Sequence, residues 1–451
     1  MEDKKVRIIG AGLAGCEAAW QAARRGVTVE LYEMKPHKYT PAHHAPTFAE
    51  LVCSNSLRSA ATDNAVGLLK EELRRLGSLI MEAADATEVP AGSALAVNRT
   101  LFSEYITDKI RENPYITVIP GEVTELDSDL PTVVATGPLT SEPLAKEISR
   151  LMGGGELHFF DAAAPIVDFA SVDTDIAFFA SRYGKGNPED YLNCPMTKEE
   201  YDAFYDALIH AETAPLKEFD RELQTDLTVF EGCMPVEVMA ARGYDTLRFG
   251  PMKPVGLPCP ATGKDAYATV QLRRENREGT MYNIVGFQTH LTFGEQKRVF
   301  SMIPGLSEAV FFRYGVMHRN TYLDSPGKLD ATYRAVAYPN LRFAGQMTGV
   351  EGYVESTASG FVAGLNAALS VLGKEDFVFS PETEIGALAH YVSHGGISSS
   401  FQPMNANFGI IAPLDKKVKG GKKMRGAAYA ERSLSRIGEY LSEIQSDENS
   451  D

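Results

Sequence analysis

The fold is decided by residues 6–36, which read VRIIGAGLAGCEAAWQAARRGVTVELYEMKP. The stretch contains a short apolar run, a glycine turn, an alanine-rich segment that ends at Gly26, and a second apolar run that closes on Glu33. Short apolar runs predict buried strands, and the longer alanine-rich segment between them predicts a helix. Together they predict a strand–helix–strand unit of the βαβ type.

The turn between the first strand and the helix carries a dinucleotide-binding fingerprint. Its members are Gly10, Ala11, Gly12, Leu13, Ala14 and Gly15, and Glu33 follows Gly15 by 18 residues. Gly10 permits the tight turn, Gly12 lets the backbone approach a pyrophosphate, and Gly15 lets helix and strand pack closely. The helix N-terminus attracts the phosphates, while Glu33 accepts hydrogen bonds from a ribose diol. Because an acid at position 33 disfavours a 2′-phosphate, we expect FAD or NAD here.

Two later segments resemble the further parts of a two-part FAD domain of the glutathione reductase type. TVVATGP (132–138) predicts a buried strand ending in a glycine turn, and residues 340–373 run from a strand through a glycine-rich loop into a helix. That loop is expected to touch the cofactor through Gly345, Gln346, Gly352 and Tyr353. The dipole of the late helix would stabilise negative charge on reduced flavin.

The region between these segments predicts an insertion. Residues 180–290 are rich in acids, prolines and aromatics and lack a second GxGxxG. The expected fold class is α/β, an FAD-binding Rossmann-like domain of the glutathione reductase type with an inserted smaller α+β domain. The expected boundaries are 1–178 and 290–372 for the two parts of the FAD-binding domain, 179–289 for the inserted domain, and 373–451 for a C-terminal segment with a basic RNA-binding stretch.

Charge and hydropathy narrow the class of protein. The net charge of −16 argues against general coating of nucleic acid, but it allows one local basic patch. Such a patch lies between Lys416 and Arg436, and includes Lys417, Lys422 and Lys423. It is either a solvated tail or a phosphate clamp. With no apolar run of 18 residues and no secretory signal pattern, we expect a cytoplasmic protein with no membrane partner.

Five widely spaced cysteines, at positions 16, 53, 194, 233 and 259, form no CxxC pair and no cluster with metal spacing. We therefore expect isolated thiols, no disulfide framework and no metal. Cys16 is interpreted as a packing residue. Cys53, within LVCSNSLRS (51–59), stands in polar company and is either a surface accident or a nucleophile, and Cys233 stays open in the same way.

Four motifs together carry a resemblance. LVCSNSLRS, EGCMPVEVMAARGYDTLRFGPMKPVGL (231–257), GFQTHLTFGEQKRVF (286–300) and FAGQMTGVEGYVESTASGFVAG (343–364) stand behind GAGLAG. The chain, from Val6 to about Arg432, closely resembles the folate- and FAD-dependent tRNA uridine-5-methyltransferases, the TrmFO family. The related GidA or MnmG flavoproteins share the FAD domain, but this chain is too short for their usual C-terminal helical domain.

The resemblance implies a reaction. A methylene group would pass from 5,10-methylenetetrahydrofolate to carbon 5 of a T-loop uridine in tRNA, giving ribothymidine. Reduced FAD would supply the electrons, and NAD(P)H would regenerate the flavin. Carbon 5 of uracil is a poor nucleophile until a thiolate adds to carbon 6, so one cysteine must be active. Cys53 and Cys233 match the two functional cysteines of the family. We expect Cys53 to attack, and Cys233 to support the flavin site or assist proton removal.

Other roles follow from the same resemblance. Tyr353 is expected to cover the isoalloxazine or to stack on a base or pterin, and His290 to stack on or protonate the folate. Arg248, with Lys253, Arg273 and Arg274, is expected to meet the folate glutamate or RNA phosphates, although these side chains equally suit ordinary surface ion pairs. The basic segment would clamp RNA phosphates, and residues 398–414 would line the pocket.

Alternatives remain at this point. The same chemistry fits a uridine of ribosomal RNA, and a non-methylating FAD- and RNA-binding assembly factor would keep the same framework. An NAD(P)H-dependent flavin oxidoreductase of small molecules is disfavoured by the missing second dinucleotide motif. The sequence also leaves open the oligomeric state, including a homo-oligomer, and which cysteine attacks.

Overall fold

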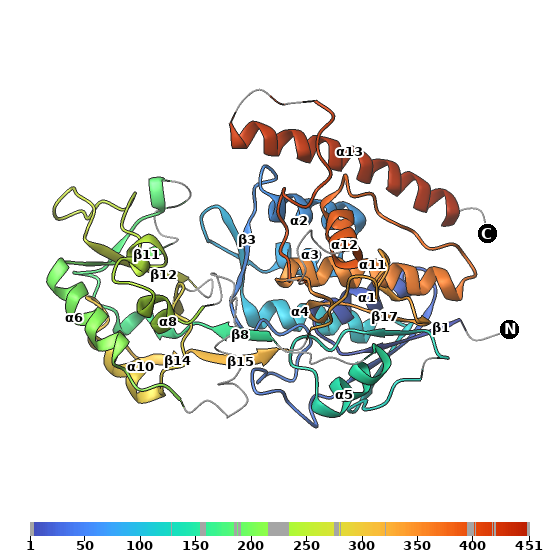
Figure 1. Cartoon of the computed structure of the whole chain (residues 1–451), viewed down its shortest axis with the longest axis horizontal. Helices are drawn as coiled ribbons and strands as arrows, with labels where there is room; N and C mark the ends of the chain where they lie inside the picture. Colours follow the sequence, from blue (N-terminus) through green and yellow to red (C-terminus); the bar gives the residue numbers. More distant parts are fainter. Residues whose placement is uncertain are drawn as a thin grey trace.

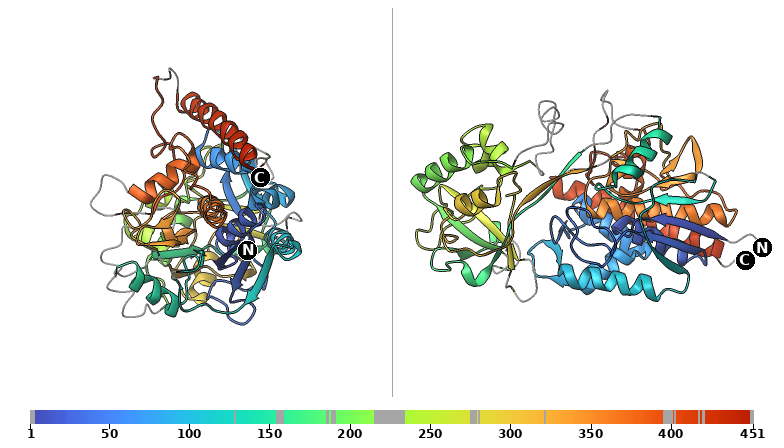
Figure 2. Two further views of the ribbon diagram at one scale, coloured as in Figure 1. Left: turned by 90° about the vertical axis from the view of Figure 1, so that its right-hand side faces the viewer. Right: turned by 90° about the horizontal axis from the view of Figure 1, so that it is seen from below.

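The computed structural model describes residues 4–127, 129–153, 159–184, 187, 191–214, 234–274, 279, 281–320, 322–394, 401, 403–416, 418 and 421–448. Two lobes are visible, joined by extended segments, and both chain termini lie at the end of the molecule away from the second lobe (Figures 1 and 2). Among the described helices, none has the length and apolar character that a membrane crossing requires.

The first lobe is built on a six-stranded sheet whose core is parallel. Its strands, in spatial order, are β16 (Arg334–Ala335), β17 (Tyr338–Phe343), β7 (Thr132–Val134), β1 (Lys5–Ile9), β2 (Thr28–Glu33) and β6 (Ile116–Pro120). All neighbours are parallel except β16 and β17. Ile8 on the central strand lies opposite Leu31 and Val133, and all three are fully buried. The three segments predicted from the glycine patterns therefore lie in one sheet.

Helices cover this sheet and extend the lobe. They are α1 (Leu13–Ala23), α2 (Ala65–Leu76), α3 (Leu79–Ala86), α4 (Arg99–Glu112), α5 (Glu142–Leu151), α11 (Tyr353–Val371), α12 (Glu384–His394) and α13 (Lys422–Glu448). Helices α1 and α11 cross in very close contact. A Cβ atom added at Gly360 would lie 2.2 Å from the carbonyl oxygen of Ala14, and one at Gly364 would lie 2.4 Å from the Cα of Ala18. The small residues of both helices permit this approach.

The second lobe has its own antiparallel sheet and its own core. The strands, in spatial order, are β10 (Phe178–Phe179), β11 (Tyr191–Met196), β12 (Ala268–Arg274), β13 (Met281–Ile284), β9 (Ile166–Asp168) and β14 (Phe311–Arg313). Its helices are α6 (Lys198–Ile209), α8 (Val236–Ala241), α9 (Thr246–Phe249) and α10 (Phe293–Phe300), and short 3₁₀ turns are η1 (Phe169–Ser171) and η2 (Arg182–Gly184). Buried residues such as Val167, Tyr201, Phe287 and Phe300 fill the core.

This second lobe reaches beyond the expected range 179–289 at both ends. Strand β9 precedes that range and β14 follows it, and they complete the antiparallel sheet because β9 pairs with both β13 and β14. Such short strands carry no glycine or composition signal, so the boundary is set by long-range pairing. A two-stranded ribbon of β8 (Phe159–Ala163) and β15 (Val316–Asn320) runs between the lobes (Figure 1).

A small third sheet positions the cysteine segment. It consists of β3 (Ser56–Ser59), β5 (Ala94–Val97) and β4 (Glu88–Val89), all antiparallel. Strand β3 begins three residues after Cys53, so the cysteine enters this sheet from a loop. The α/β class with an FAD-type Rossmann domain and an α+β insertion is confirmed.

Candidate functional site

The glycine turn has three glycines with three different surroundings. Gly10 has a φ of +98°, and a Cβ there would lie 2.7 Å from the carbonyl oxygen of Ala135. A Cβ on Gly15 would lie 1.7 Å from the carbonyl oxygen of Gly10. A Cβ on Gly12 would meet no described protein atom within 4 Å. The chain itself therefore requires glycine at positions 10 and 15, while the space beside Gly12 is available to a ligand.

The N-terminus of α1 opens onto that space. Gly12 is its N-cap, and no side chain caps the helix there. The first N–H groups of a helix have no partner within the helix, and they carry the positive end of its dipole. Gly12, Leu13 and Ala14 all line the pocket. This is the arrangement that binds a pyrophosphate.

Glu33 lies at the end of β2, as expected, and is buried beside the turn. Its Oε2 accepts a 2.8 Å hydrogen bond from the backbone N–H of Ala11, and its Oε1 accepts one of 2.9 Å from that of Lys35. Each carboxylate oxygen has two lone pairs, so both can accept a further bond from a ribose diol. The Glu33 carboxylate thus fixes the glycine turn and also faces the pocket.

The pocket extends well past the glycine turn. Its empty volume, counted out to its open mouth, is about 1200 Å³. Its lining comprises residues 9–14, 32–35, 121–123, 135–141 and 345–346, with Thr40, His43, Ala49, Glu50, Val52, Leu144, Tyr353 and Ser356. An elongated dinucleotide fits this lining, because the pocket runs from the end of β2 past the α1 N-terminus to the start of α11.

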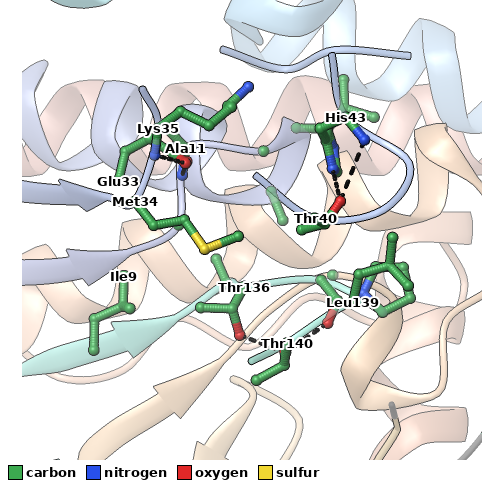
Figure 3. A pocket seen from close by; sticks show the side chains of 18 of the residues that line it. Ile9, Ala11, Glu33, Met34, Lys35, Thr40, His43, Thr136, Leu139 and Thr140 are labelled. Carbon is green, nitrogen blue, oxygen red and sulfur yellow. Dashed lines mark hydrogen bonds between the residues drawn. The ribbon is translucent and has the colours of Figure 1, made fainter. Parts of the chain in front are cut away.

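Several lining residues had no signal in the sequence. Thr40 and His43 lie on a loop across the pocket from Thr136 and Thr140 (Figure 3). The Oγ1 of Thr40 is 2.6 Å from Nδ1 of His43, and the two threonine hydroxyls Thr136 and Thr140 are 2.7 Å apart. Only the strand-and-turn pattern of 132–138 pointed to this wall, while residues 40–43 follow no recognisable pattern.

The late glycine-rich loop reaches the same pocket. Gly345, with a φ of +84°, places Gln346 on the wall, and a Cβ at Gly345 would lie 3.3 Å from the Cβ of Ala14. Gly352 has a φ of +120° and is the N-cap of α11, again without a side-chain cap. Tyr353 is the first residue of this helix. The uncapped N-termini of α1 and α11 therefore both border the cofactor pocket.

Tyr353 connects the pocket to the cysteine segment. The backbone N–H of Cys53 donates a 2.8 Å hydrogen bond to the Tyr353 hydroxyl oxygen, and that of Ser54 donates one of 3.3 Å. The carbonyl of Cys53 accepts a 3.2 Å bond from Nη2 of Arg99. Cys53 as a residue is half-buried. Both peptide groups of this residue are therefore fixed at the edge of the pocket.

Charged side chains of α2 and α11 support the segment that follows Cys53. Lys70 on α2 is fully buried, and its ammonium donates hydrogen bonds to the carbonyls of Leu57 (2.7 Å) and Arg58 (3.1 Å). Burial, reinforced by the nearby Arg58 charge, lowers the pKa of Lys70 to about 7. Arg58, with a φ of +64°, forms an ion pair with the buried Glu355 of α11. The loop that carries Cys53 is thus braced against α2 and α11.

The other cysteines differ from Cys53. Cys16 and Cys194 are fully buried, and burial raises the pKa of each thiol, that of Cys194 to about 12. Cys16 is thus a packing residue, as expected. Cys259 is partly exposed. Cys233 lies outside the described residues, so its role stays a prediction. Across the part of the chain that is described, no group of three His, Cys, Asp or Glu could hold a metal ion.

His290 and Arg248 both lie in the second lobe. The backbone N–H of His290 donates a 2.8 Å hydrogen bond to Oε1 of Glu237, whose pKa is raised by burial. The Arg248 guanidinium lies 3.8 Å from the ring centre of Tyr267, and its Nη1 pairs with Asp245 at 2.5 Å. Arg248 therefore has structural partners within the second lobe, and a contact with folate or RNA stays a prediction for both residues.

The basic segment has two parts with different surroundings. Lys416 and Lys423 are exposed, Lys417 lies outside the described residues, and Lys422 begins α13 with a side chain that is not described. Arg432 instead donates to the carbonyls of Pro413 (2.7 Å) and Ala412 (2.6 Å). Arg432 thus holds the preceding loop, while Lys416 and Lys423 face solvent.

The loop before α13 contacts the late glycine-rich loop that leads into α11. A Cβ at Gly349 would lie 2.3 Å from the ring of Phe401. The backbone of Met404 exchanges hydrogen bonds of 2.9 and 2.8 Å with Gly349 and Glu351. Glu355 accepts a 2.8 Å bond from the N–H of Ala406. Phe401, Met404 and Ala406 therefore pack on the loop that leads into α11.

Comparison with known proteins agrees with this geometry. The GIDA family model, described as glucose inhibited division protein A, matches residues 5–375. The methylenetetrahydrofolate--tRNA-(uracil-5-)-methyltransferase TrmFO of Acetivibrio thermocellus is 61% identical over 437 residues, covering 97% of this chain and 98% of that protein. The chain belongs to the TrmFO family.

Other relatives extend the match. The TrmFO protein of Anoxybacillus flavithermus is 58% identical over 440 residues, covering 98% of this chain and 100% of that protein. The structure of Aquifex aeolicus GidA in its form II crystal superposes with a TM-score of 0.69 at 18% identity, covering 97% of this chain and 73% of that one. The GidA likeness is one of fold. The family predicted from the four TrmFO motifs is confirmed.

Proposed function

We propose that this protein methylates carbon 5 of a T-loop uridine in tRNA, using 5,10-methylenetetrahydrofolate as the one-carbon donor and reduced FAD as the reductant. The observation that carries the proposal is the hydrogen bond between Cys53 and Tyr353. It holds a partly exposed thiol residue beside a dinucleotide pocket, in a chain that shares 61% of its sequence with a methyltransferase of this name.

The chain supplies a nucleophile for the uracil ring. The Cys53 sulfur adds to carbon 6 as a thiolate, which makes carbon 5 an enolate carbon able to attack the one-carbon unit of the folate. A base then removes the proton from carbon 5 as tetrahydrofolate leaves the methylene carbon, and the Cys53 sulfur leaves carbon 6 when that carbon is reduced. Reduced FAD, when bound, supplies the two electrons that turn the bridging methylene into methyl. The balance is one uridine, one methylenetetrahydrofolate and one reduced FAD giving one 5-methyluridine, one tetrahydrofolate and one oxidised FAD.

The described residues support this role by fixing the nucleophile. Tyr353 accepts from two consecutive N–H groups of the loop, and Arg99 donates to the carbonyl between them. Such positioning keeps the sulfur in one place while the base binds. Tyr353 is the first residue of α11, and the uncapped N-terminus of this helix favours negative charge at this end of the pocket. We assign Cys233 to the flavin site or to removal of the carbon 5 proton.

The remaining partners are proposed on the same basis. NADH or NADPH restores the reduced flavin. The second lobe contributes His290 and Arg248 to the folate, and the exposed Lys416 and Lys423, with Lys417 and Lys422, meet tRNA phosphates. Flipping the target base from a folded T loop requires a basic rim around a concave pocket. The reaction takes place in the cytoplasm, where tRNA and reduced folate meet.

A covalent-trapping experiment tests the nucleophile. A T-arm RNA carrying 5-fluorouridine is incubated with reduced FAD enzyme and methylenetetrahydrofolate, and the product is separated on a denaturing gel. Fluorine replaces the proton that must leave carbon 5, so the sulfur adduct persists. We expect a shifted band with the wild type and with Cys259→Ala, which changes another partly exposed thiol. Loss in Cys53→Ala alone supports the assignment, and loss in Cys233→Ala alone would reverse it. Adducts on ribosomal RNA but not on the T arm would show that the substrate is ribosomal RNA rather than tRNA.

A further inference from the structure

We propose that Arg273, on strand β12 of the second lobe, is a positioning residue for the Cys53 loop and adds to the positive charge that Arg99 places beside this residue. The inference rests on the proposed role of Cys53 and adds a residue to it. Arg273 does not need to touch substrate for this role, because it acts through the loop.

The first observation is a direct contact between the lobes. The Arg273 guanidinium donates a 2.6 Å hydrogen bond from Nη2 to Oγ of Ser54, the residue that follows Cys53. Its Nε is buried and has no hydrogen-bond acceptor among the described residues. Charge-assisted bonds of this length are about twice as strong as neutral ones. Ser54 is thus the acceptor that holds this guanidinium next to the cysteine.

A second contact makes the same connection through the backbone. The Asn55 amide is fully buried, and its Nδ2 donates to the carbonyls of Arg274 (3.1 Å) and Val97 (3.3 Å). The N–H of Val97 in turn donates a 2.9 Å bond to the Asn55 carbonyl. Asn55 therefore joins β5 of the first lobe to the end of β12 in the second.

These contacts complete the support of the loop. Tyr353 and Arg99 hold the two peptide groups of Cys53 from the first lobe, while Arg273 holds the next side chain from the second. A thiolate is stabilised by cations near it, and here Arg99 contacts Cys53 while Arg273 contacts the next residue. The reactivity of a thiol follows its thiolate fraction. The charge on Arg273 therefore reaches Cys53 only when the second lobe is in the place described here. The reactivity of the thiol is linked in this way to the lobe that carries His290 and Arg248.

The test is the alkylation rate of Cys53 in FAD-loaded protein, followed by mass spectrometry of the peptide that contains it. Iodoacetamide is used between pH 6 and 9. For Arg273→Gln we expect a rate at pH 7 that is lower by about fivefold, because the apparent thiol pKa rises when the cation is removed. Arg273→Lys, which keeps the charge, should recover part of the rate. Ser54→Ala, which removes the acceptor, should lower it by about twofold.

Arg274→Gln is the matched control. It removes a neighbouring cation on the same strand whose side chain reaches Tyr282 rather than the cysteine loop, and it keeps the backbone carbonyl that Asn55 uses. We expect its rate to stay within about twofold of the wild type. Equal pH profiles for Arg273→Gln and the wild type would overturn the inference. If Arg273→Gln does not retain FAD, an unchanged rate in Ser54→Ala would overturn it. Alkylation requires no methyl transfer, so failure of the proposed function leaves this readout intact.

Discussion

The backbone N–H of Cys53 donates a 2.8 Å hydrogen bond to the hydroxyl of Tyr353, across 300 residues of sequence. Tyr353 also lines the dinucleotide pocket and begins α11. One tyrosine therefore contacts both the thiol-bearing loop and the cofactor space. The loop that carries Cys53 and the wall of the pocket are consequently joined by one side chain.

Removal of the Tyr353 hydroxyl should lower kcat while leaving FAD binding unchanged. In Tyr353→Phe the N–H groups of Cys53 and Ser54 lose their acceptor, and one such bond contributes about 1 kcal/mol. We expect kcat for tRNA methylation to fall about fivefold to tenfold, with the FAD content of the purified protein unchanged. The control is Tyr115→Phe, which alters a half-exposed tyrosine distant in sequence from both elements. Equal kcat in the wild type and Tyr353→Phe would contradict this account.

Two substitutions in the glycine turn should have different effects, one on cofactor binding and the other on folding. Gly12→Ala adds a Cβ into space without described protein atoms, so the protein should fold and lose FAD. Gly15→Ala places a Cβ 1.7 Å from the carbonyl oxygen of Gly10, so α1 must move and folding should suffer. Flavin absorbance and the thermal midpoint of each purified variant measure the two effects. Full FAD occupancy in Gly12→Ala would show that the ligand does not approach this glycine.

A buried carboxyl beneath α13 should make stability depend on pH. Glu72 is fully buried and accepts hydrogen bonds from the N–H groups of Glu384 and Ile385 (2.8 Å each) and from the hydroxyl of Ser433. Burial raises its pKa from 4.5 to about 7. Burial and the Glu72 charge also raise the pKa of Glu384. The folded state therefore holds protons between about pH 4.5 and 7 that the unfolded state has released.

The difference in bound protons between the folded and unfolded states fixes the direction in which stability changes with pH. The stabilisation is complete below pH 4.5, and it is lost as the pH rises through about 7. A difference of this size corresponds to about 3 kcal/mol. We expect Glu72→Gln to flatten the dependence of the thermal midpoint between pH 5 and 7.5. Its overall stability should be lower, because one amide oxygen cannot replace two carboxylate oxygens. Parallel pH curves for wild type and variant would exclude this role for Glu72.

The exposed lysines should contribute to tRNA binding through charge. In a Lys416→Gln, Lys423→Gln double variant, we expect weaker binding for all tRNA sequences and a salt dependence reduced by about two counterions. Lys146→Gln is the control, since it removes a lysine that is 75% exposed on α5 and paired with Glu142. The measurement is the dissociation constant as a function of salt. An unchanged slope in the double variant would place the RNA elsewhere.

The sequence was sufficient where local patterns carry the structure. The glycine turn, Glu33 at its strand end, and the late loop before α11 each leave a signature within about 30 residues, and all of them line one pocket. The contact between Cys53 and Tyr353 has no such signature, because the two residues are 300 positions apart and the sequence around each gives no information about the other. Family resemblance brought both to attention, and the fold brought them together.

Other features depended on long-range packing. Strands β9 and β14 join the second sheet only through pairing, so the expected boundaries at 179 and 289 fell inside the second lobe. Arg432 stands in a basic run that suggested RNA, yet it holds the loop at Pro413. Charge patterning gives the position of a side chain along the chain, and it does not give the partner.

The most direct test of the central claim is the origin of the methyl carbon in tRNA. Unmodified tRNA is incubated with FAD-loaded protein, NADPH and methylenetetrahydrofolate carrying ¹³C in its one-carbon unit, and the digested nucleosides are analysed by mass spectrometry. We predict 5-methyluridine that carries the label with wild-type protein, and none with Cys53→Ala. Absence of 5-methyluridine, or a methyl group without the label, would contradict folate-dependent methylation by this protein.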